Sequence, residues 1–440
     1  MNRDEIVRRD KAHVWHPYTP LDAWAATDPI VVARAEGARL FDADGRSYLD
    51  GNASWWTAAL GHNHPRLLRA LREQSERFAH VALAGITHEP AAALAAELLA
   101  IAPAGLTHVF YTDNGSTAIE ASIKACVQSF AQSGRPEKNR FVALQGAFHG
   151  DTVGAASLGG VEVFRRPFGA VLFDVVHVPS PAPGDDAGRA YLEAFERLHA
   201  IVERDADTIA AIYVEPVVQG AAGMRVYDPT YLQSLRALCD RRDVLLVFDE
   251  VFTGYGRTGP MWAGARAGVA PDVMCVGKGF CPILPMGAML CGERVLRGFG
   301  GGRERAFLYG HTFCGNPLGA AVAREVLAVY RDEDVLGQVA RKSKAIERAF
   351  ARLADVPGVA RVRAIGMIGA ADLEPAGGSA AGYLGGLGWQ VSEAARARGA
   401  YLRPLGDTIY VTPPLTIPDD DLDRLLAILD DSVRGTMAGR

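Results

Sequence analysis

The sequence predicts an α/β protein built on a mostly parallel sheet, and three observations lead to that prediction. The chain has 440 residues, 49% hydrophobic and 22% charged, which is enough for two or three domains with a large core. Its middle part alternates short apolar runs with helical periodicity, as expected when helices cover a parallel sheet on both faces. After about residue 330 this alternation stops, which indicates a second, smaller α+β domain.

The strands of the large sheet are predicted from apolar runs of four to six residues bounded by turn or helix signals. A helix is predicted after the first run and another before the fourth. The expected strands are 107–111, 141–144, 209–214, 244–248 and 273–276, and the expected helices are 118–132 and about 229–241.

The C-terminal part has helical periodicity over 335–354, then a mixed segment, then a final helix from about Pro418. The run of aspartates after Pro418 favours a helix start, because acidic side chains are stabilising in a first turn. We therefore expect a segment 1–60 that packs with the small domain, a large domain 61–330 and a small domain 331–440.

Charge and cysteine content exclude several protein classes. A formal net charge of −5 argues against nucleic-acid binding, which needs an excess of Lys and Arg. The first 18 residues lack the apolar stretch of a secretory signal, and no run is long enough to span a membrane. No CxxC pair occurs, so we expect reduced thiols, a cytoplasmic protein and no metal site. The cysteines are Cys126, Cys239, Cys275, Cys281, Cys291 and Cys314.

An acid and a lysine follow neighbouring predicted strands. Asp249 ends the fourth apolar run and Lys278 follows the fifth. Ligands of such sheets bind beyond the carboxyl ends of the strands, so both side chains are expected to reach one pocket. A carboxylate beside a pyridinium nitrogen and a lysine that binds an aldehyde suit pyridoxal phosphate. Taken singly, Asp249 as a turn cap and Lys278 as a surface lysine are the alternatives.

Three further strand ends carry complementary groups. Gly115 and Ser116 open the first predicted helix, where backbone N–H groups could hold a phosphate. Phe148, beside His149, could stack on a flat ring, and Gln219 could offer its amide to a ring substituent. Taken singly, an ordinary N-cap, a buried aromatic side chain and a solvated loop residue are the alternatives. Because complementary groups follow several successive strands, a shared cofactor site is favoured.

Two other patterns in the sequence have a functional interpretation that their context does not favour. Residues 254–259 fit GxGxxG, but Pro260 follows and no helix opens at once, so a nicotinamide dehydrogenase is a distant alternative. His62 and His64 lack a third ligand nearby, and GHNHP is interpreted as a turn entering a helix.

Longer motifs resemble the class III aminotransferases of PLP fold type I over nearly the whole chain. They are LLVFDEVFTGYGRTG with GKG downstream, DNGSTAIEASIK, FHGDT, EPVVQGAAGM and GHTFCGNPLGAA. The resemblance implies pyridoxal phosphate as cofactor, small-molecule substrates and a homodimer with active sites shared at the subunit interface.

The resemblance also implies roles for individual residues. Lys278 is the Schiff-base lysine, Asp249 pairs with the pyridine nitrogen, and Thr312 reaches the phosphate from the partner subunit. Arg403 is the partner of a keto-acid carboxylate, which a guanidinium binds in a bidentate manner. The other cofactor contacts are Gly115, Ser116, Phe148, His149 and Gln219, and the other substrate contacts are Tyr18, Trp55, Gly310 and Tyr410.

Within the class, the WHPYT segment, the Trp55-Trp56 pair and the Arg403 turn resemble the enzymes that aminate 8-amino-7-oxononanoate in biotin synthesis. S-adenosylmethionine is the amino donor in most of them and lysine in some. The sequence departs from them at Phe148, usually tyrosine, at His311, usually proline, and at 280–283, where Thr-Gly-Gly is usual.

These departures keep other functions open. The alternatives are a broad ω-aminotransferase for diamines or ω-amino acids, and a non-catalytic protein that binds pyridoxal phosphate. Intact Lys278 and Asp249 argue against the second.

Overall fold

A mostly parallel sheet forms the centre of the molecule. The computed structural model of the chain describes residues 1–182, 187–374 and 382–438. Within them, the largest sheet has seven strands, and every neighbouring pair is parallel except the two pairs formed by β12. In spatial order the strands are β4 (Leu106–Thr112), β12 (Gly287–Gly292), β11 (Val273–Val276), β10 (Leu245–Asp249), β7 (Ile209–Val214), β5 (Arg140–Leu144) and β6 (Val176–Val178). The predicted fold class is confirmed.

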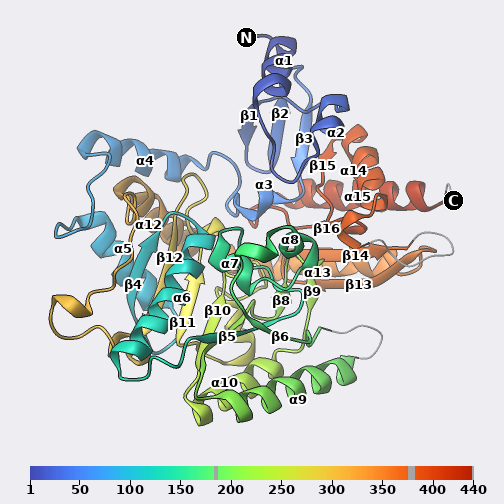
Figure 1. Ribbon diagram of the computed structural model, residues 1–440. Helices are drawn as coiled ribbons and strands as arrows, with labels where there is room; N and C mark the ends of the chain where they lie inside the picture. Colours follow the sequence, from blue (N-terminus) through green and yellow to red (C-terminus); the bar gives the residue numbers. More distant parts are fainter. Residues whose placement is uncertain (183–186, 375–381, 439–440) are drawn as a thin grey trace.

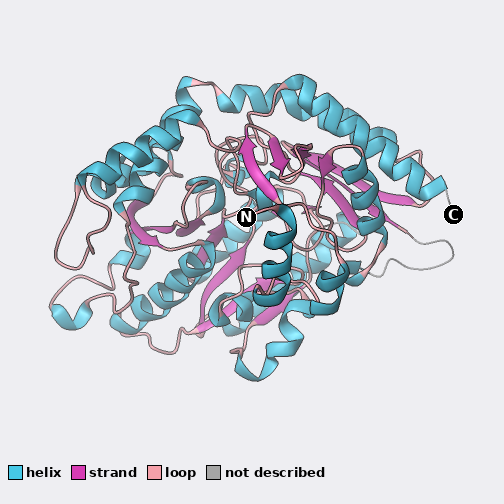
Figure 2. Cartoon of the chain, turned by 90° about the horizontal axis from the view of Figure 1, so that it is seen from above, coloured by secondary structure: helices cyan, strands magenta, loops and turns pink. Residues whose placement is uncertain are grey.

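Helices cover both faces of this sheet, as Figure 2 shows. Alternate strand side chains explain the two layers, because successive residues of a strand point to opposite faces. Phe141 and Tyr213 pack with Ile119 of α6, whereas Val142 and Ile212 pack on the other face with the apolar sides of α9 and α10. The helices of this part are α4 (Pro65–Arg77), α5 (Glu89–Ile101), α6 (Gly115–Gln132), α7 (Val153–Leu158), α8 (Glu162–Arg165), α9 (Ala187–Asp205), α10 (Thr230–Arg242), α11 (Glu293–Leu296) and α12 (Pro317–Asp332).

The two ends of the chain meet in a second region. There β3 pairs in parallel with β15, which brings the N-terminal strands beside the C-terminal helices in Figure 1. One sheet consists of β1 (Val32–Glu36), β2 (Arg39–Asp42), β3 (Ser47–Asp50) and β15 (Ala400–Tyr401), and another of β13 (Val359–Ile365), β14 (Ile368–Leu373) and β16 (Thr408–Val411). The helices are α1 (Arg3–His13), α2 (Leu21–Ala26), α3 (Ala53–Trp56), α13 (Val335–Leu353), α14 (Leu387–Ala397) and α15 (Asp419–Ala438). The domain boundaries at residues 60 and 330 stay predictions.

Two strands of the large sheet were not predicted. β12 begins and ends with glycine and has no β-branched or aromatic residue, and β6 has only three residues, so neither gives a strong strand pattern. The GxGxxG stretch 254–259 forms successive turns and opens no helix. Its Arg257 is buried and donates to the carbonyl of Pro413 at 2.7 Å.

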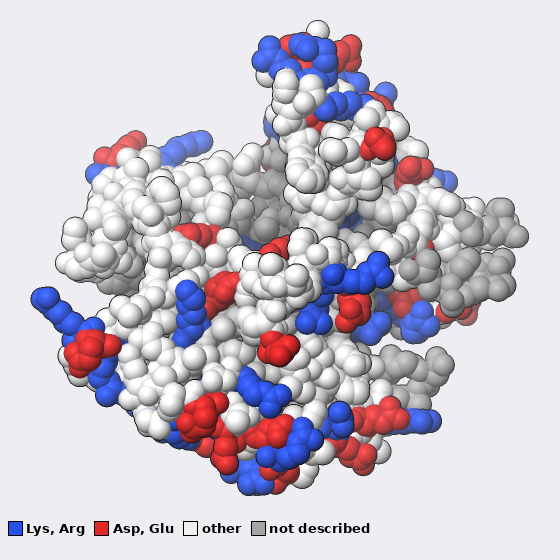
Figure 3. Space-filling model, in the orientation of Figure 1, with Lys and Arg blue, Asp and Glu red and all other residues white. Residues whose placement is uncertain are grey.

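The surface mixes charges of both signs. Lys and Arg side chains lie among Asp and Glu side chains over the face seen in Figure 3. Among the described residues, no helix combines the length and apolar character needed to cross a bilayer.

A buried carboxyl group beside the sheet makes stability depend on pH. Burial raises the pKa of Glu250 from its ordinary 4.5 to about 7, although its oxygens accept from Thr253 Oγ1 and Gly264 N. Between pH 4.5 and about 7, Glu250 is protonated in the folded state but ionised in the unfolded state. The contribution of Glu250 to the free energy of unfolding therefore falls as the pH rises through this range.

We predict that Glu250→Gln removes up to about 3 kcal/mol of this pH dependence. The melting temperature of the variant should fall less than that of the wild type as the pH rises from 4.5 to 7. The exposed Glu293→Gln is the matched control and should follow the wild type. Equal slopes for all three proteins would contradict a protonated Glu250.

Candidate active site

The carboxyl ends of the parallel strands surround one cavity of about 810 Å³. Parallel strands end at the same edge, so residues far apart in sequence meet there. Of the predicted site residues, those that line the cavity are Tyr18, Trp55, Gly115, Ser116, Phe148, His149, Asp249, Lys278 and Arg403.

Lys278 follows β11 in a left-handed conformation with φ of 48°. Its Nζ lies 4.6 Å from the ring centre of Trp56 and has no hydrogen-bond or ion-pair partner among the residues described. Burial lowers the pKa of this amine, and the nearby Asp249 and Glu215 carboxylates oppose that shift only in part. The site therefore favours a neutral, nucleophilic amine.

Asp249, at the end of β10, is held in a fixed orientation. Its Oδ1 accepts from Val251 N at 3.0 Å, and its Oδ2 lies 2.7 Å from His149 Nδ1, which donates to the carboxylate. Both side chains are almost fully buried. The buried His149 Nε2 has no partner in the described part of the chain. Asp249 thus presents a positioned negative charge to the cavity.

The start of α6 forms a small cradle. Asn114 caps this 18-residue helix with a reciprocal bond to Thr117, which leaves the N–H groups of Gly115 and Ser116 in its first turn. Gly150 packs across Ser116, and a Cβ at Gly150 would lie 2.2 Å from Ser116 Oγ. Free N–H groups at a helix start suit an anion such as a phosphate.

The tandem tryptophans are presented by a strained turn. Ala53, Ser54, Trp55 and Trp56 all have positive φ, which costs about 1–2 kcal/mol per residue outside glycine. Asp50 holds the turn, because its Oδ2 accepts from both N and Oγ of Ser54. Strain of this kind persists where the surrounding structure fixes it, often at functional sites.

Arg403 is a cation that lies against aromatic rings. Its guanidinium carbon is 4.5 Å from the ring centre of Trp55 and 5.9 Å from that of Trp389. Its backbone N–H donates to Asn52 Oδ1 at 2.6 Å, and no carboxylate of the described residues pairs with it. The guanidinium therefore remains available for a ligand carboxylate.

Aromatic and aliphatic side chains line the rest of the cavity. Phe164 makes edge contacts with Tyr18, Phe148 and Tyr383. Opposite them, the segment 281–286 contributes six lining residues that include two prolines and a methionine. The walls thus suit a ligand with an apolar chain between its polar ends.

Four predicted site residues lie outside this cavity. Gln219 is buried in β8 (Val218–Gln219), where its amide donates to Gln145 O and accepts from Ser180 Oγ. Tyr410 is buried behind Trp56, and its carbonyl accepts from Asn52 Nδ2 at 3.4 Å. Gly310 and Thr312 lie exposed on the loop before α12.

Glu215, a buried acid directly after β7, also lines the cavity but was not among the predicted site residues. Its oxygens accept from Phe148 N and Gly220 N, so it fixes the segment that carries Phe148. Burial raises the pKa of Glu215 to about 7, with a further contribution from Asp249. The same rule that selected Asp249 could have selected it. Tyr18 was predicted, but its hydroxyl's bond to Asp151 was not.

The arrangement combines a desolvated amine, an oriented carboxylate, an anion cradle and an unpaired guanidinium around one cavity. Covalent capture of a carbonyl by the amine is the chemistry that this set supports.

Comparison with known proteins points to the same chemistry. The sequence profile of the family "Aminotransferase class-III" matches residues 22–433. The chain is 39% identical to the adenosylmethionine-8-amino-7-oxononanoate aminotransferase of Geobacter sulfurreducens, over 98% of this chain and 97% of the relative.

Two solved structures are similar over 99% of this chain. One is the adenosylmethionine-8-amino-7-oxononanoate aminotransferase of Methanocaldococcus jannaschii, with 29% identity, 99% of its chain covered and a TM-score of 0.92. The other is the omega transaminase of Pseudomonas jessenii in complex with PMP, with 28% identity, 98% coverage and a TM-score of 0.91.

We predict that the Lys278 amine of the ligand-free protein reacts at a lower pH than exposed lysines. Acetic anhydride labelling across a pH series, read by mass spectrometry, should show Lys278 modified before the exposed Lys344. Labelling of Lys278 only at higher pH than Lys344 would show that its charged form is favoured.

Proposed function

The chain belongs to the class III aminotransferases, and we propose that it transfers an amino group from S-adenosylmethionine to 8-amino-7-oxononanoate in biotin synthesis. The family membership makes it a pyridoxal-phosphate-dependent transferase. The observation that carries the substrate assignment is the unpaired Arg403 in the wall of a largely apolar cavity, since the acceptor is a long-chain keto acid.

The residues present fit pyridoxal phosphate. The free N–H groups of Gly115 and Ser116 are placed to hold its phosphate, and a Cβ at Gly150 would close that cradle. Asp249, held by His149, is the carboxylate for its ring nitrogen, and Phe148 is the aromatic neighbour. When bound, the cofactor supplies an electrophilic aldehyde and an electron-withdrawing ring.

Lys278 is proposed as the catalytic residue. Its lowered pKa favours the neutral amine that must bind the cofactor's aldehyde. The Nζ of Lys278 would also serve as the base that takes the proton from the α-carbon of the amino donor. Asp249, whose side chain is almost fully buried, is the acid that lines the same cavity.

Arg403 is proposed to bind the acceptor's carboxylate. The rings of Trp55 and Trp389 lie beside the guanidinium, and these cation–π contacts help to fix its orientation for the carboxylate. The ring of Tyr18 packs against Trp55, and its hydroxyl donates to Asp151. We expect Tyr18 and Asp151 to border the path of the acceptor's aliphatic chain.

The active site is proposed to be completed by a second copy of the chain. Gly310 and Thr312 lie outside this chain's cavity, on a loop that also exposes Leu308 and Phe313 to 79% and 56%. Large exposed apolar side chains are typical of protein interfaces. Thr312 of the partner subunit would then contact the phosphate.

A broad ω-aminotransferase is the second candidate. The likeness to the omega transaminase and the apolar segment 281–286 beside Lys278 favour it. Diamines and ω-amino acids would occupy the same cavity as the proposed substrates. The turnover rates measured with each substrate class therefore distinguish the two functions.

We predict that S-adenosylmethionine removes the absorbance of the cofactor's aldehyde form from the purified enzyme, and that 8-amino-7-oxononanoate restores it. Lys278→Ala should lose at least about 10²-fold in turnover, because its amine is the proposed base. Efficient turnover of putrescine or β-alanine without response to S-adenosylmethionine would replace the proposed substrates but keep the aminotransferase chemistry.

We predict that Arg403→Ala raises the KM for the keto acid by about 10- to 100-fold, the loss expected for a charged hydrogen bond. The donor half-reaction should change less. Trp389→Leu should raise the same KM by a smaller factor, and Trp389→Phe should recover most of it, because a ring is retained. Equal losses in both half-reactions would remove the proposed role of Arg403.

A further inference from the structure

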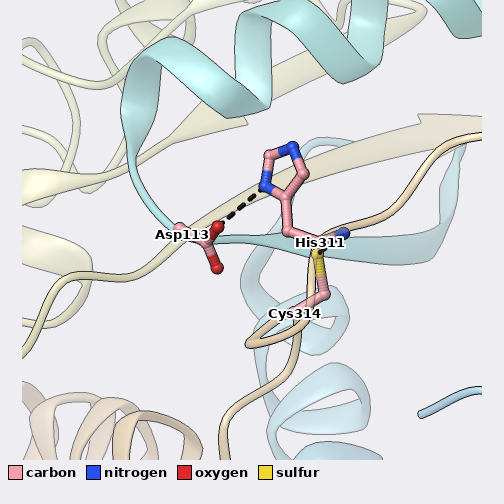
Figure 4. Close-up of side chains that lie close together, drawn as sticks. All are labelled: Asp113, His311 and Cys314. Carbon is pink, nitrogen blue, oxygen red and sulfur yellow. Dashed lines mark hydrogen bonds and ion pairs between the residues drawn. The ribbon is translucent and has the colours of Figure 1, made fainter. Parts of the chain in front are cut away.

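A group of metal-binding side chains lies beside the active site and takes no part in the proposed reaction. Asp113 lies between β4 and α6, and His311 and Cys314 lie on the loop before α12. Figure 4 shows Asp113 and His311 pointing toward each other, with the thiol of Cys314 next to them. One candidate ligand atom from each residue lies within 4.8 Å of the others.

The ligand types and spacing suit zinc. Imidazole nitrogen, thiolate sulfur and carboxylate oxygen are its usual protein ligands, and three of them leave a fourth position open to water. Bonds of about 2.0–2.3 Å in a tetrahedron place ligand atoms about 3.3–3.8 Å apart. Small side-chain rotations would therefore bring these three atoms to a common ion.

The unsatisfied state of Asp113 is an independent observation. Its Oδ2 is 2.8 Å from His311 Nδ1, but its buried Oδ1 has no partner among the described residues. A buried carboxylate oxygen without a partner is costly, and a cation would satisfy it. Of the cysteines, Cys314 alone is half-buried whereas the other five are buried, and its sulfur accepts from His311 N at 3.2 Å.

Rigid elements hold the ligands from both sides. Asp113 directly precedes Asn114, the cap of α6, and Cys314 is two residues before Asn316, the cap of α12. The ring of His311 also packs edge-on against Tyr309, with centroids 5.0 Å apart. Ligands placed by capped helices need little ordering when an ion binds.

We propose that Asp113, His311 and Cys314 bind one divalent transition-metal ion of the zinc type, with water at the open position. No metal site was predicted here, because Asp113 is almost 200 residues away from His311 in the sequence. The ion links the loop that carries Gly310 and Thr312 to the start of α6. The proposal does not depend on the identity of the amino donor or acceptor.

Cobalt binding to the full-length, cofactor-loaded enzyme tests this site after treatment with a chelator. Co²⁺ serves as the probe because its visible bands report tetrahedral geometry and thiolate ligation, and Zn²⁺ is added as competitor. The expected result is one ion per chain with a thiolate band. Cys314→Ser should lose that band and at least about tenfold in affinity, since even partners of metal ligands affect affinity by about 10- to 100-fold.

The matched controls separate metal binding from misfolding. His311→Gln should weaken binding as Cys314→Ser does, whereas His199→Gln, on α9, should bind as the wild type does. Melting curves without metal should show that all four proteins are folded at the temperature of the binding assay. Absence of a tetrahedral cobalt spectrum in the wild type, or an unchanged spectrum in Cys314→Ser, would overturn the proposal and leave only an Asp113–His311 ion pair.

Discussion

Lys278 holds its amine 4.6 Å from the Trp56 ring, without a hydrogen-bond partner among the described residues, and the rest of the site is arranged around that constraint. A charged ammonium loses hydration in such a place, so burial lowers its pKa. Asp249 and Glu215 oppose this effect, but their own oxygens are occupied by His149, Val251, Phe148 and Gly220. The acids are thus fixed as part of the scaffold while the amine stays available.

The scaffold explains how strained backbone is tolerated at this place. Lys278 and the run 53–56 adopt positive φ values that ordinary residues avoid. The run is held by Asp50 and by packing of Trp56 on Phe252, and Lys278 sits between β11 and the buried Phe280. A strand ends shortly before each strained segment, β3 before residues 53–56 and β11 before Lys278, and these contacts offset the cost of the strain.

The lining of the cavity comes from two parts of the fold. Lys278, Asp249 and the start of α6 belong to the large sheet, whereas Arg403 belongs to the region formed by the two chain ends. Aromatic rings and the segment 281–286 form much of the remaining wall. Substrate range can therefore change through the walls without changing the chemistry, and proteins named as different kinds of aminotransferase share this fold.

The sequence by itself determined the fold class, five of the seven strands of the large sheet and the strand-end groups, because apolar periodicity and the polar residue after each strand are local features. It also indicated Lys278, Asp249 and Gly115, which line the cavity as expected. Only the tertiary structure decided that Gln219 and Tyr410 point elsewhere, that Trp389 packs beside Arg403, and that Asp113 meets His311. Those outcomes depend on which distant segments pack together, and no local pattern encodes the direction of a side chain within such a contact.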